Sequence, residues 1–489
     1  MAGIKKNFLF SSAYQLLTII TPIITTPYLS RVIGAEGNGI FSFTQSVTNY
    51  FVLFAILGMS SYGVRAVAEC GDDRARRSDV FWNAFSMTCV TGTIVVLVYI
   101  VYVALFGQGY LLLYLIWGLW VVGSVLDVSW LFFGCQTFSI PTTGNFITKF
   151  CSVAMILVLV KSPGDVWAYV LAISGANFAN SIIPWFFLRH FVDHVRPQWS
   201  HMASHLKPTL VLFVPVIAIS IYGVLDKIML GVLTTVEQVG YFDYAEKISK
   251  MPLSLITALG AAVLPRMAQI IGAGHIEEGK RLVGTTMWFM LACAFALSFG
   301  IVGVAPSFCP AFFGDGFDAC VPLMSVLAFV IPTICVTNVI GNQYMLPCHR
   351  DREYTISVSI GAAVNVVANL ITIPLWGAMG AALSSVLSEV AVMIAQGWCV
   401  RGDLDLVGYA RDCLPFALAG VIMAIVLRFL DAAIRPAIGN WPALGIEFVV
   451  GAATYLVLAL LWSVRNERER LLAVFPRLGR HLQADGTER

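Results

Sequence analysis

Charged side chains of both signs lie inside stretches of the chain that are otherwise almost entirely apolar. Burying such a group in a bilayer costs about 2.5–3.5 kcal/mol, so each should face a hydrated interior or a partner of opposite charge. Buried cations are suited to hold an anionic group, and buried acids are suited to bind a cation or a proton. The cations are Lys149, Lys227, Lys247, Lys250 and Arg428, and the acids include Asp127, Asp226, Glu246, Glu389 and Asp431.

Their placement predicts a cationic cavity that holds the head group of an anionic substrate. Lys149 and Glu389 lie near the middle of their apolar stretches, far from any helix end. Lys247 and Lys250 are spaced i, i+3 and share a helix face. The predicted substrate-binding residues are Lys149, Lys227, Lys247 and Lys250, and the predicted ion-coupling or gating residues are Asp127, Asp226, Glu246 and Glu389.

A purely structural interpretation stays open for part of this set. Salt bridges inside the protein, such as one between Asp226 and Lys247, would fix the helix register and explain Asp226, Lys227 and Glu246 equally well. For Arg428 and Asp431, which are spaced i, i+3 near a helix end, local pairing and extension toward the interface are favoured.

The elements that position these residues follow from composition. Of 489 residues, 58% are hydrophobic and 12% are charged, against about 25% charged in soluble proteins. This excludes a soluble globular protein, a disordered chain, a collagen and a coiled coil. A spanning helix needs about 20 apolar residues, and fourteen such stretches recur. We place them at 8–30, 39–64, 81–106, 111–134, 140–160, 166–188, 209–232, 240–265, 284–305, 319–346, 354–374, 378–400, 412–433 and 442–464.

The charges of the connecting segments predict the orientation. Of the 30 Lys and Arg residues, 22 fall on one side of the predicted spans, and only Arg31, Lys161 and Arg435 fall on the other. The positive-inside rule then places both termini in the cytoplasm and requires an even number of spans. The outer connections are too short for a folded domain outside the membrane.

A weak internal repeat predicts two lobes. Residues 39–43 resemble 240–244, and in each case a Leu-Gly pair follows about twenty residues after the first glycine. Six predicted spans separate the copies, so both have the same orientation, as in transporters built from parallel repeats. We expect an all-α polytopic membrane protein with an N-terminal lobe, a C-terminal lobe, and two extra spans with a basic tail. Their ranges are 1–205, 206–405 and 406–489.

Cofactor chemistry is not expected. The eleven cysteines have no regular spacing and no CxxC pair, so neither a zinc site nor a disulfide framework is predicted. Cys309 and Cys320 flank one outer connection, and whether they pair stays open. The sequence contains no Walker loop or nucleophile elbow, and a net charge of +2 gives no reason to expect nucleic acid as a partner.

Six motifs resemble the polysaccharide transporter family, the oligosaccharide-lipid flippases of the multidrug/oligosaccharidyl-lipid/polysaccharide exporter superfamily. The resemblance covers about residues 8–400, and the last two spans match poorly. The motifs are TPYLSRVIG at 26–34, DVSWLFFG at 127–134, LDKIMLG at 225–231, VGYFDYAEKI at 239–248, GNQYMLP at 341–347 and GAMGAA at 377–382.

The resemblance implies a flippase of the bacterial plasma (inner) membrane. Its substrate would be an undecaprenyl-pyrophosphate-linked oligosaccharide, carried by alternating access for O-antigen, capsule or exopolysaccharide synthesis. An H⁺ or Na⁺ gradient would drive the cycle, and a polysaccharide polymerase is a candidate partner. The residues inside matched motifs are Arg31, Asp127, Asp226, Lys227, Glu246 and Lys247, and Arg31 joins the expected substrate-binding set on this ground.

Two other functions make different demands on the sequence. A multidrug or cation exporter of the same superfamily would favour acids over lysines in its cavity, whereas Lys149, Lys247 and Lys250 favour an anionic substrate. A membrane-embedded glycan polymerase or glycosyltransferase would need a catalytic carboxylate or a substantial domain on the outer face, and the outer connections are too short. We therefore expect a transporter and not an enzyme.

Overall fold

The structure is a computed structural model that describes residues 20–468, 470 and 471, and these residues form helices and connecting turns without a strand. The chain divides into two compact units, Met1–Asp243 and Tyr244–Arg489. Residues 20–32 of the N-terminal unit are helical. The next elements are α2 Gly34–Ile56, α3 Met59–Ala68, α4 Arg74–Phe106, α5 Leu111–Leu126, α6 Ser129–Gly134, α7 Ser139–Leu159, η1 Pro163–Asp165, α8 Val166–Ile182, η2 Ile183–His190 and α9 Trp199–Leu233.

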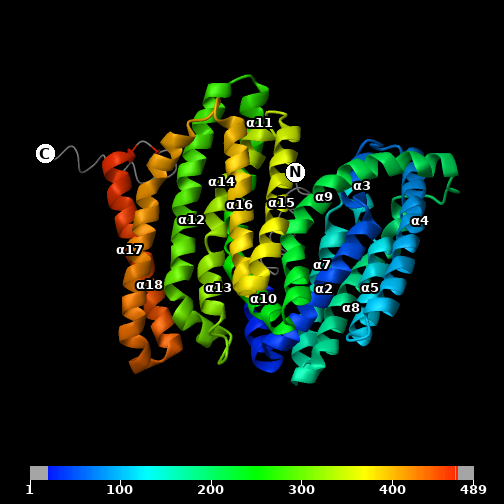
Figure 1. Ribbon diagram of the computed structural model, residues 1–489. Coiled ribbons are helices and arrows are strands. Elements are labelled where there is room, and N and C mark those ends of the chain that lie inside the picture. The colour runs from blue at the N-terminus through cyan, green and yellow to red at the C-terminus, as the bar shows by residue number, and fades with distance from the viewer. Residues whose placement is uncertain (1–19, 469, 472–489) are drawn as a thin grey trace. The chain divides into compact units, whose positions relative to one another are not determined.

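Helix α10, Val236–Lys250, crosses the boundary between the two units. In the C-terminal unit, α12 packs against α17 and α18, and α15 packs against α16 (Figure 1). The elements of this unit are α11 Leu253–Gly272, α12 Ile276–Phe312, α13 Cys320–Leu327, α14 Val330–Thr337, the π-helical η3 Asn338–Met345, α15 Asp351–Trp376, α16 Ala378–Val400, α17 Leu406–Ile438 and α18 Asn440–Asn466.

The described helices coincide with the predicted apolar stretches. Eleven of them are long and apolar enough to cross a membrane, which confirms a helical, multi-pass membrane protein. The total of fourteen spans and the cytoplasmic termini stay predictions, because the start of the first stretch and most of the basic tail lie outside the described residues. The predicted division at residues 205 and 405 also stays a prediction.

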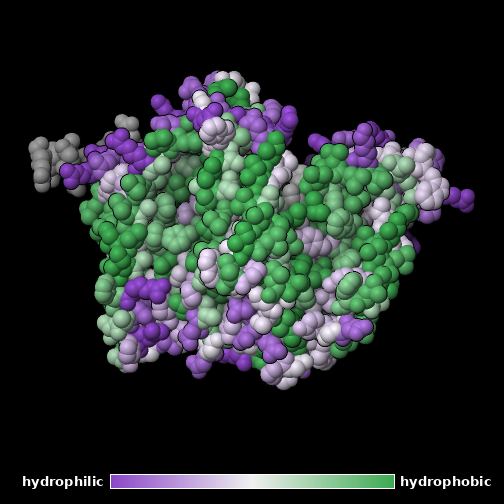
Figure 2. Space-filling view, viewed as in Figure 1, coloured by the Kyte–Doolittle hydropathy of each residue, from purple (hydrophilic) through white to green (hydrophobic). Residues whose placement is uncertain are grey.

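Large apolar side chains that face outward identify the surfaces in contact with lipid. On α4, Leu97 and Val101 are more than half exposed, and on α18, Phe448 and Val449 are more exposed still. In the space-filling view, hydrophobic residues cover the middle of the helices and hydrophilic residues gather at their ends (Figure 2). A soluble protein rarely exposes apolar area on this scale, so these faces are suited to hydrocarbon.

The backbones of α2 and α10 touch at two glycines. A Cβ atom on Gly39 would lie 1.7 Å from the carbonyl oxygen of Val236, and one on Gly240 would lie 1.8 Å from that of Ala35. Gly39 therefore contacts the residue four positions before Gly240, and Gly240 contacts the residue four positions before Gly39. These are the two glycines that the sequence repeat aligned. Small residues permit such close approach of helices in membranes.

Two helix breaks differ from the prediction of continuous spans. Helix α2 ends at Ile56, where Leu57 and Gly58 both adopt left-handed backbone conformations. Helix α5 ends at Leu126, and the Asp127 carboxylate accepts a hydrogen bond of 2.9 Å from the Ser129 amide at the start of α6. Asp127 therefore lies at a helix end inside the span Leu111–Gly134.

Hydrogen bonds connect the segment before α9 to the start of α4. Arg74 forms two hydrogen bonds of 2.8 Å with Asp193 and also donates to the carbonyl oxygens of Arg189 and His190. These bonds hold the pKa of the Asp193 carboxyl below its ordinary value. The Tyr62 hydroxyl lies 2.5 Å from Nδ1 of His205. Helix α9 thus begins at a point fixed by α3 and α4.

We expect Gly39→Ala and Gly240→Ala each to destabilise the protein, because the new methyl group would overlap a carbonyl oxygen. Overpacking of this kind costs about 1–3 kcal/mol or more. The measurement is thermal unfolding of the purified protein together with its abundance in the membrane. Gly175→Ala and Gly223→Ala are matched controls, because a Cβ there meets no atom within 4 Å. Equal melting temperatures in all four variants would contradict the close crossing.

Candidate functional site

A buried ionic network joins α2, α9 and α10. The Lys227 ammonium lies 2.6 Å from Oδ1 of Asp243, and Asn38 donates a hydrogen bond of 2.8 Å to Oδ2 of the same carboxylate. The Asp243 side chain is 1% exposed and that of Lys227 is 17% exposed. Each residue comes from a different helix, so this single carboxylate holds the three helices in register.

Asp243 is the residue that sequence reasoning missed. The motif at 239–248 contains it, and it precedes Glu246 by three positions in a predicted span, yet only Glu246 was counted among the intramembrane acids. The available signal was its i, i+3 spacing from Glu246 on a helix that also carries Lys247 and Lys250. The structure gives Lys227 an acidic partner, as the salt-bridge interpretation expected, but that partner is Asp243.

Aromatic residues surround the network. The rings of Tyr169 on α8 and Phe41 on α2 stack with centroids 3.7 Å apart, and both side chains are buried. Tyr169 lies within electrostatic reach of Asp243 and Lys227. On α2, Oδ1 of Asn38 and Oγ of Ser42 are buried and have no hydrogen-bond partner among the described residues. Since unsatisfied buried polar atoms are costly, this region has binding capacity beyond the pairs that it contains.

Asp226 lies one position before Lys227 and is 2% exposed. It lies within electrostatic reach of Tyr50 on α2, whose hydroxyl donates to the carbonyl oxygen of Ser220 over 3.4 Å. Adjacent residues on a helix point in different directions, so the side chains of Asp226 and Lys227 contact different neighbours.

The C-terminal unit brings together three of the predicted site residues. Lys250 lies 2.7 Å from Oε1 of Glu246, one turn earlier on α10. Glu389 on α16 is 8% exposed and lies within electrostatic reach of Lys250. Lys247 lies between Glu246 and Lys250 on α10 and is half-buried. Lys250 therefore has a carboxylate neighbour on its own helix and another on α16.

Other predicted site residues lie on other elements of the N-terminal unit. Arg31 is exposed, and its guanidinium donates a hydrogen bond of 2.7 Å to the carbonyl oxygen of Pro27. Lys149 is half-buried on α7, and Asp127 caps α6. Their roles as a binding cation or a gating acid stay predictions.

Metal chemistry has no evident location in the described chain. Within residues 20–468 and 470–471, no three His, Cys, Asp or Glu side chains are grouped to hold a metal ion. Cys309 and Cys320 are both buried and are not joined in a disulfide, and Sγ of Cys309 lies 3.5 Å from Sδ of Met324.

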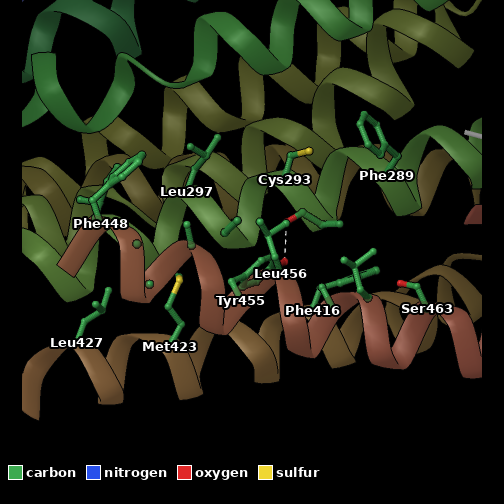
Figure 3. Close-up of a pocket in the computed structure, with 18 of the residues that line it drawn as sticks. Phe289, Cys293, Leu297, Phe416, Met423, Leu427, Phe448, Tyr455, Leu456 and Ser463 are labelled. Carbon is green, nitrogen blue, oxygen red and sulfur yellow. Dashed lines mark hydrogen bonds between the residues drawn. The ribbon is translucent and has the colours of Figure 1, made fainter. Parts of the chain in front are cut away.

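An apolar cavity of about 710 Å³ lies among α12, α17 and α18 (Figure 3). Its walls carry aliphatic, aromatic and sulfur-containing side chains, including Leu297, Met423 and Leu456. The Tyr455 hydroxyl in its wall donates a hydrogen bond of 2.6 Å to the carbonyl oxygen of Ala292. Among the lining residues Glu447 carries the one carboxyl group. The last two spans match the family poorly in sequence, and no sequence feature indicated a cavity there.

The fold is that of transporters of the multidrug/oligosaccharidyl-lipid/polysaccharide (MOP) superfamily. It is similar to the structure "Lipid II flippase MurJ, inward closed conformation", with a TM-score of 0.72, 14% identity and coverage of 94% of this chain and 99% of that chain. It is also similar to an inward-facing multidrug resistance MATE family transporter of the MOP superfamily. There the TM-score is 0.60 at 13% identity, with 85% of this chain and 96% of that chain covered.

Residues 4–271 match the family described as "Polysaccharide biosynthesis protein", so the chain belongs to this family and the resemblance seen in the sequence is confirmed. A relative from Escherichia coli (strain K12) has the name "Putative O-antigen transporter". It is 23% identical over 413 residues, which are 83% of this chain and 98% of the relative. The fold and this relative's name are those of transporters, as the sequence predicted, and not those of enzymes.

We expect Asp243→Asn to destabilise the protein strongly, because it removes the carboxylate that lies 2.6 Å from the half-buried Lys227 ammonium. Breaking one side of a buried pair costs about 3–5 kcal/mol. The double variant Lys227→Met, Asp243→Asn should recover much of this loss, since it removes both charges of the pair. Thermal unfolding of the purified single and double variants measures the effect, and Lys161→Met, at an exposed cation, is the control. Additive losses in the double variant would contradict the pair.

Proposed function

We propose that this protein is a flippase for an undecaprenyl-pyrophosphate-linked oligosaccharide in the bacterial plasma (inner) membrane. It would supply lipid-linked units for cell-surface polysaccharide such as O-antigen, capsule or exopolysaccharide. The observation that carries this proposal is the family match over residues 4–271, together with an O-antigen transporter relative that aligns over 98% of its length.

The chemistry of such a substrate explains why the chain retains buried cations. A pyrophosphate and a sugar unit are both too polar to cross about 30 Å of hydrocarbon unaided. Lys227 and Lys250 already have carboxylate partners in the structure. We infer that the pyrophosphate competes with these carboxylates for the ammonium groups, with Arg31, Lys149 and Lys247 completing the cationic set. A lysine ammonium binds phosphate as a point charge without fixed geometry, which suits a ligand that must also leave.

Exchange of partners also provides a way to couple transport to an ion. When a phosphate takes Lys250, the carboxylates of Glu246 and Glu389 lose their counter-charge. An H⁺ or Na⁺ that binds those acids would restore the balance. Asp127, Asp226, Glu246 and Glu389 are the proposed coupling or gating acids, and alternating access would expose them to each side of the membrane in turn.

The apolar cavity fits the other end of the substrate. A polyprenyl chain is a hydrocarbon, and the cavity among α12, α17 and α18 offers it an apolar surface within the C-terminal unit. The hydrophobic surface of the helices (Figure 2) would allow the rest of the chain to stay in lipid.

Export of a cationic drug is the second candidate, because the fold is also similar to that of a MATE transporter. Buried acids such as Asp243 and Glu389 would suit a cation. The two candidates are separated by transport into proteoliposomes that contain the purified protein. A fluorescent undecaprenyl-pyrophosphate-linked oligosaccharide should become accessible to a glycosidase added on the opposite side, whereas a cationic dye should not accumulate. Dye transport without glycolipid transport would reverse the choice.

Lys149 provides a residue-level test of the cationic set. We expect Lys149→Ala and Lys149→Gln to abolish glycolipid flipping at normal protein abundance, and Lys149→Arg to retain part of it, because the charge matters more than the shape. Lys161→Ala, which removes an exposed cation, should transport normally. Normal flipping by Lys149→Ala would remove this residue from the substrate path. A fall in abundance of Lys149→Ala and Lys149→Gln would indicate a structural role instead.

Ion dependence can be measured in the same liposomes. We expect an imposed H⁺ or Na⁺ gradient to accelerate flipping several-fold, and Glu389→Gln to lose this acceleration while keeping binding of the glycolipid. Insensitivity of the native protein to both gradients would contradict ion coupling and leave the flippase assignment standing.

A further inference from the structure

The chain changes direction where α18 ends. The helix stops at Asn466, and Glu467 has φ −133° and ψ 37°, which lie outside the helical range. The Glu467 amide donates a hydrogen bond of 2.9 Å to the carbonyl oxygen of Ser463, and the Leu471 amide donates one of 3.0 Å to the carbonyl oxygen of Glu467. These two bonds connect Ser463 to Leu471 through Glu467, so the chain stays close to the end of α18.

The Leu471 side chain forms part of the wall of the apolar cavity. It is 3% exposed, and it lines the cavity together with Ser463 and Phe289. Ser463 and Phe289 lie at the opposite end of the cavity from Leu427 and Phe448 (Figure 3). Because the hydrogen bonds of Glu467 keep Leu471 near Ser463, Leu471 belongs to the Ser463 end.

Leu471 differs from the rest of the wall in how it is attached. Of the lining residues that the structure describes, it is the one outside α12, α17 and α18. Aromatic side chains at this end pack on one another, since the centroid of the Phe416 ring on α17 lies 5.3 Å from those of Trp288 on α12 and Trp462 on α18. Displacing one of these rings would disturb three helices, whereas displacing Leu471 moves only the segment after α18.

An ion pair fixes this segment to α17. Nη1 of Arg470 lies 2.5 Å from Oδ2 of Asp412 and 3.3 Å from Oε2 of Glu467. The Arg470 and Asp412 side chains are 32% and 23% exposed, so water reaches the pair. The start of α17 is itself attached to α12, because the Tyr409 hydroxyl donates a hydrogen bond of 3.3 Å to the carbonyl oxygen of Lys280. Arg470 therefore holds Leu471 against a fixed part of the C-terminal unit.

We propose that Arg470 and Leu471 form a latch that closes this end of the apolar cavity, and that a hydrocarbon chain opens the latch by taking the place of the Leu471 side chain. A leucine side chain and a hydrocarbon chain fill an apolar space equally well, because burial of apolar surface is not directional. The exchange therefore costs little beyond the Arg470 ion pair, and a partly exposed ion pair contributes little to stability. That the chain is the polyprenyl tail of the substrate rests on the proposed function.

The closed latch and the bound chain exclude each other. Only the fraction of protein with an open latch can bind the chain, so the latch lowers the apparent affinity by that fraction. Linkage makes the effect reciprocal, so a chain that binds must also loosen the latch to the same extent. Loss of the Arg470 ion pair should therefore increase binding of the chain, and binding of the chain should expose the backbone around Leu471.

The first test is photo-cross-linking of the full-length purified protein in nanodiscs. The probes are undecaprenyl phosphate and palmitic acid, each with a diazirine in its hydrocarbon chain, and mass spectrometry measures their capture on the cavity walls of α12 and α18. We expect Arg470→Gln and Leu471→Ala to increase capture about two- to fivefold, the range that one partly exposed ion pair supports. Arg470→Lys should stay near the native level, as should Arg465→Gln, which removes an exposed cation from the last turn of α18.

The outcomes separate the latch from the proposed function. An increase with both probes supports both. An increase with palmitic acid alone supports the latch and counts against the polyprenyl assignment. Unchanged capture of both probes in Arg470→Gln and Leu471→Ala, with a lower melting temperature in Leu471→Ala, would show that Leu471 only packs against its neighbours and would overturn the proposal.

Hydrogen–deuterium exchange gives the reciprocal readout. In the native protein, we expect undecaprenyl phosphate or palmitic acid to accelerate exchange in the peptide that contains Glu467 and Leu471, because the Leu471 amide loses its bond to the Glu467 carbonyl. Arg470→Gln should exchange faster even without a probe, and Arg465→Gln should behave like the native protein. Native exchange that neither probe changes would overturn the displacement of Leu471. Neither experiment measures flipping, so failure here leaves the flippase assignment standing.

Discussion

The close crossing of α2 and α10 is the constraint on which the candidate site depends. Only because Gly39 and Gly240 lack side chains can the two backbones touch, and this contact brings Asn38, one residue before Gly39, to the carboxylate of Asp243, three residues after Gly240. The Lys227 ammonium then lies within hydrogen-bond distance of the same Asp243 carboxylate. A single methyl group at either glycine would separate the helices and leave a charge buried in hydrocarbon. Backbone geometry and electrostatics are thus fixed by the same pair of residues.

Neutralised cations change how anion binding must be understood. A lysine that waited unpaired inside a membrane would be costly, and the structure avoids that cost by giving Lys227 and Lys250 carboxylate partners. In the function proposed above, an anionic substrate would displace a carboxylate, and the affinity of each site would be a difference between two ion pairs. Such a site would bind more weakly than a free cation, but it would release its ligand readily. The proposal also makes the protonation of the displaced acid part of the cycle, which would be a direct physical route to ion coupling.

Hydropathy and charge predicted the helices well but the contacts poorly. Runs of about twenty apolar residues located the eleven described helices that could cross a membrane, because length and hydrophobicity decide whether a segment can cross a bilayer. They carry no information about rotation around the helix axis. The sequence therefore named Lys227 and Glu246 but not Asp243, and it treated Asp127 as part of a continuous helix although it ends α5 and caps α6. The sequence repeat aligned Gly39 with Gly240, but nothing in the sequence predicted that the two glycines would lie against each other's helices.

The buried acids of this protein have two kinds of partner. Asp243 and Glu246 each lie beside a lysine ammonium, whereas Glu447 accepts a hydrogen bond from the neutral Ser307 hydroxyl and lines an apolar cavity. A charged ligand can act on the first kind of acid by competing for its ammonium partner. The second kind lies beside a surface that is suited to hydrocarbon, so an apolar ligand in the cavity would contact the residues around Glu447 without exchanging an ion pair.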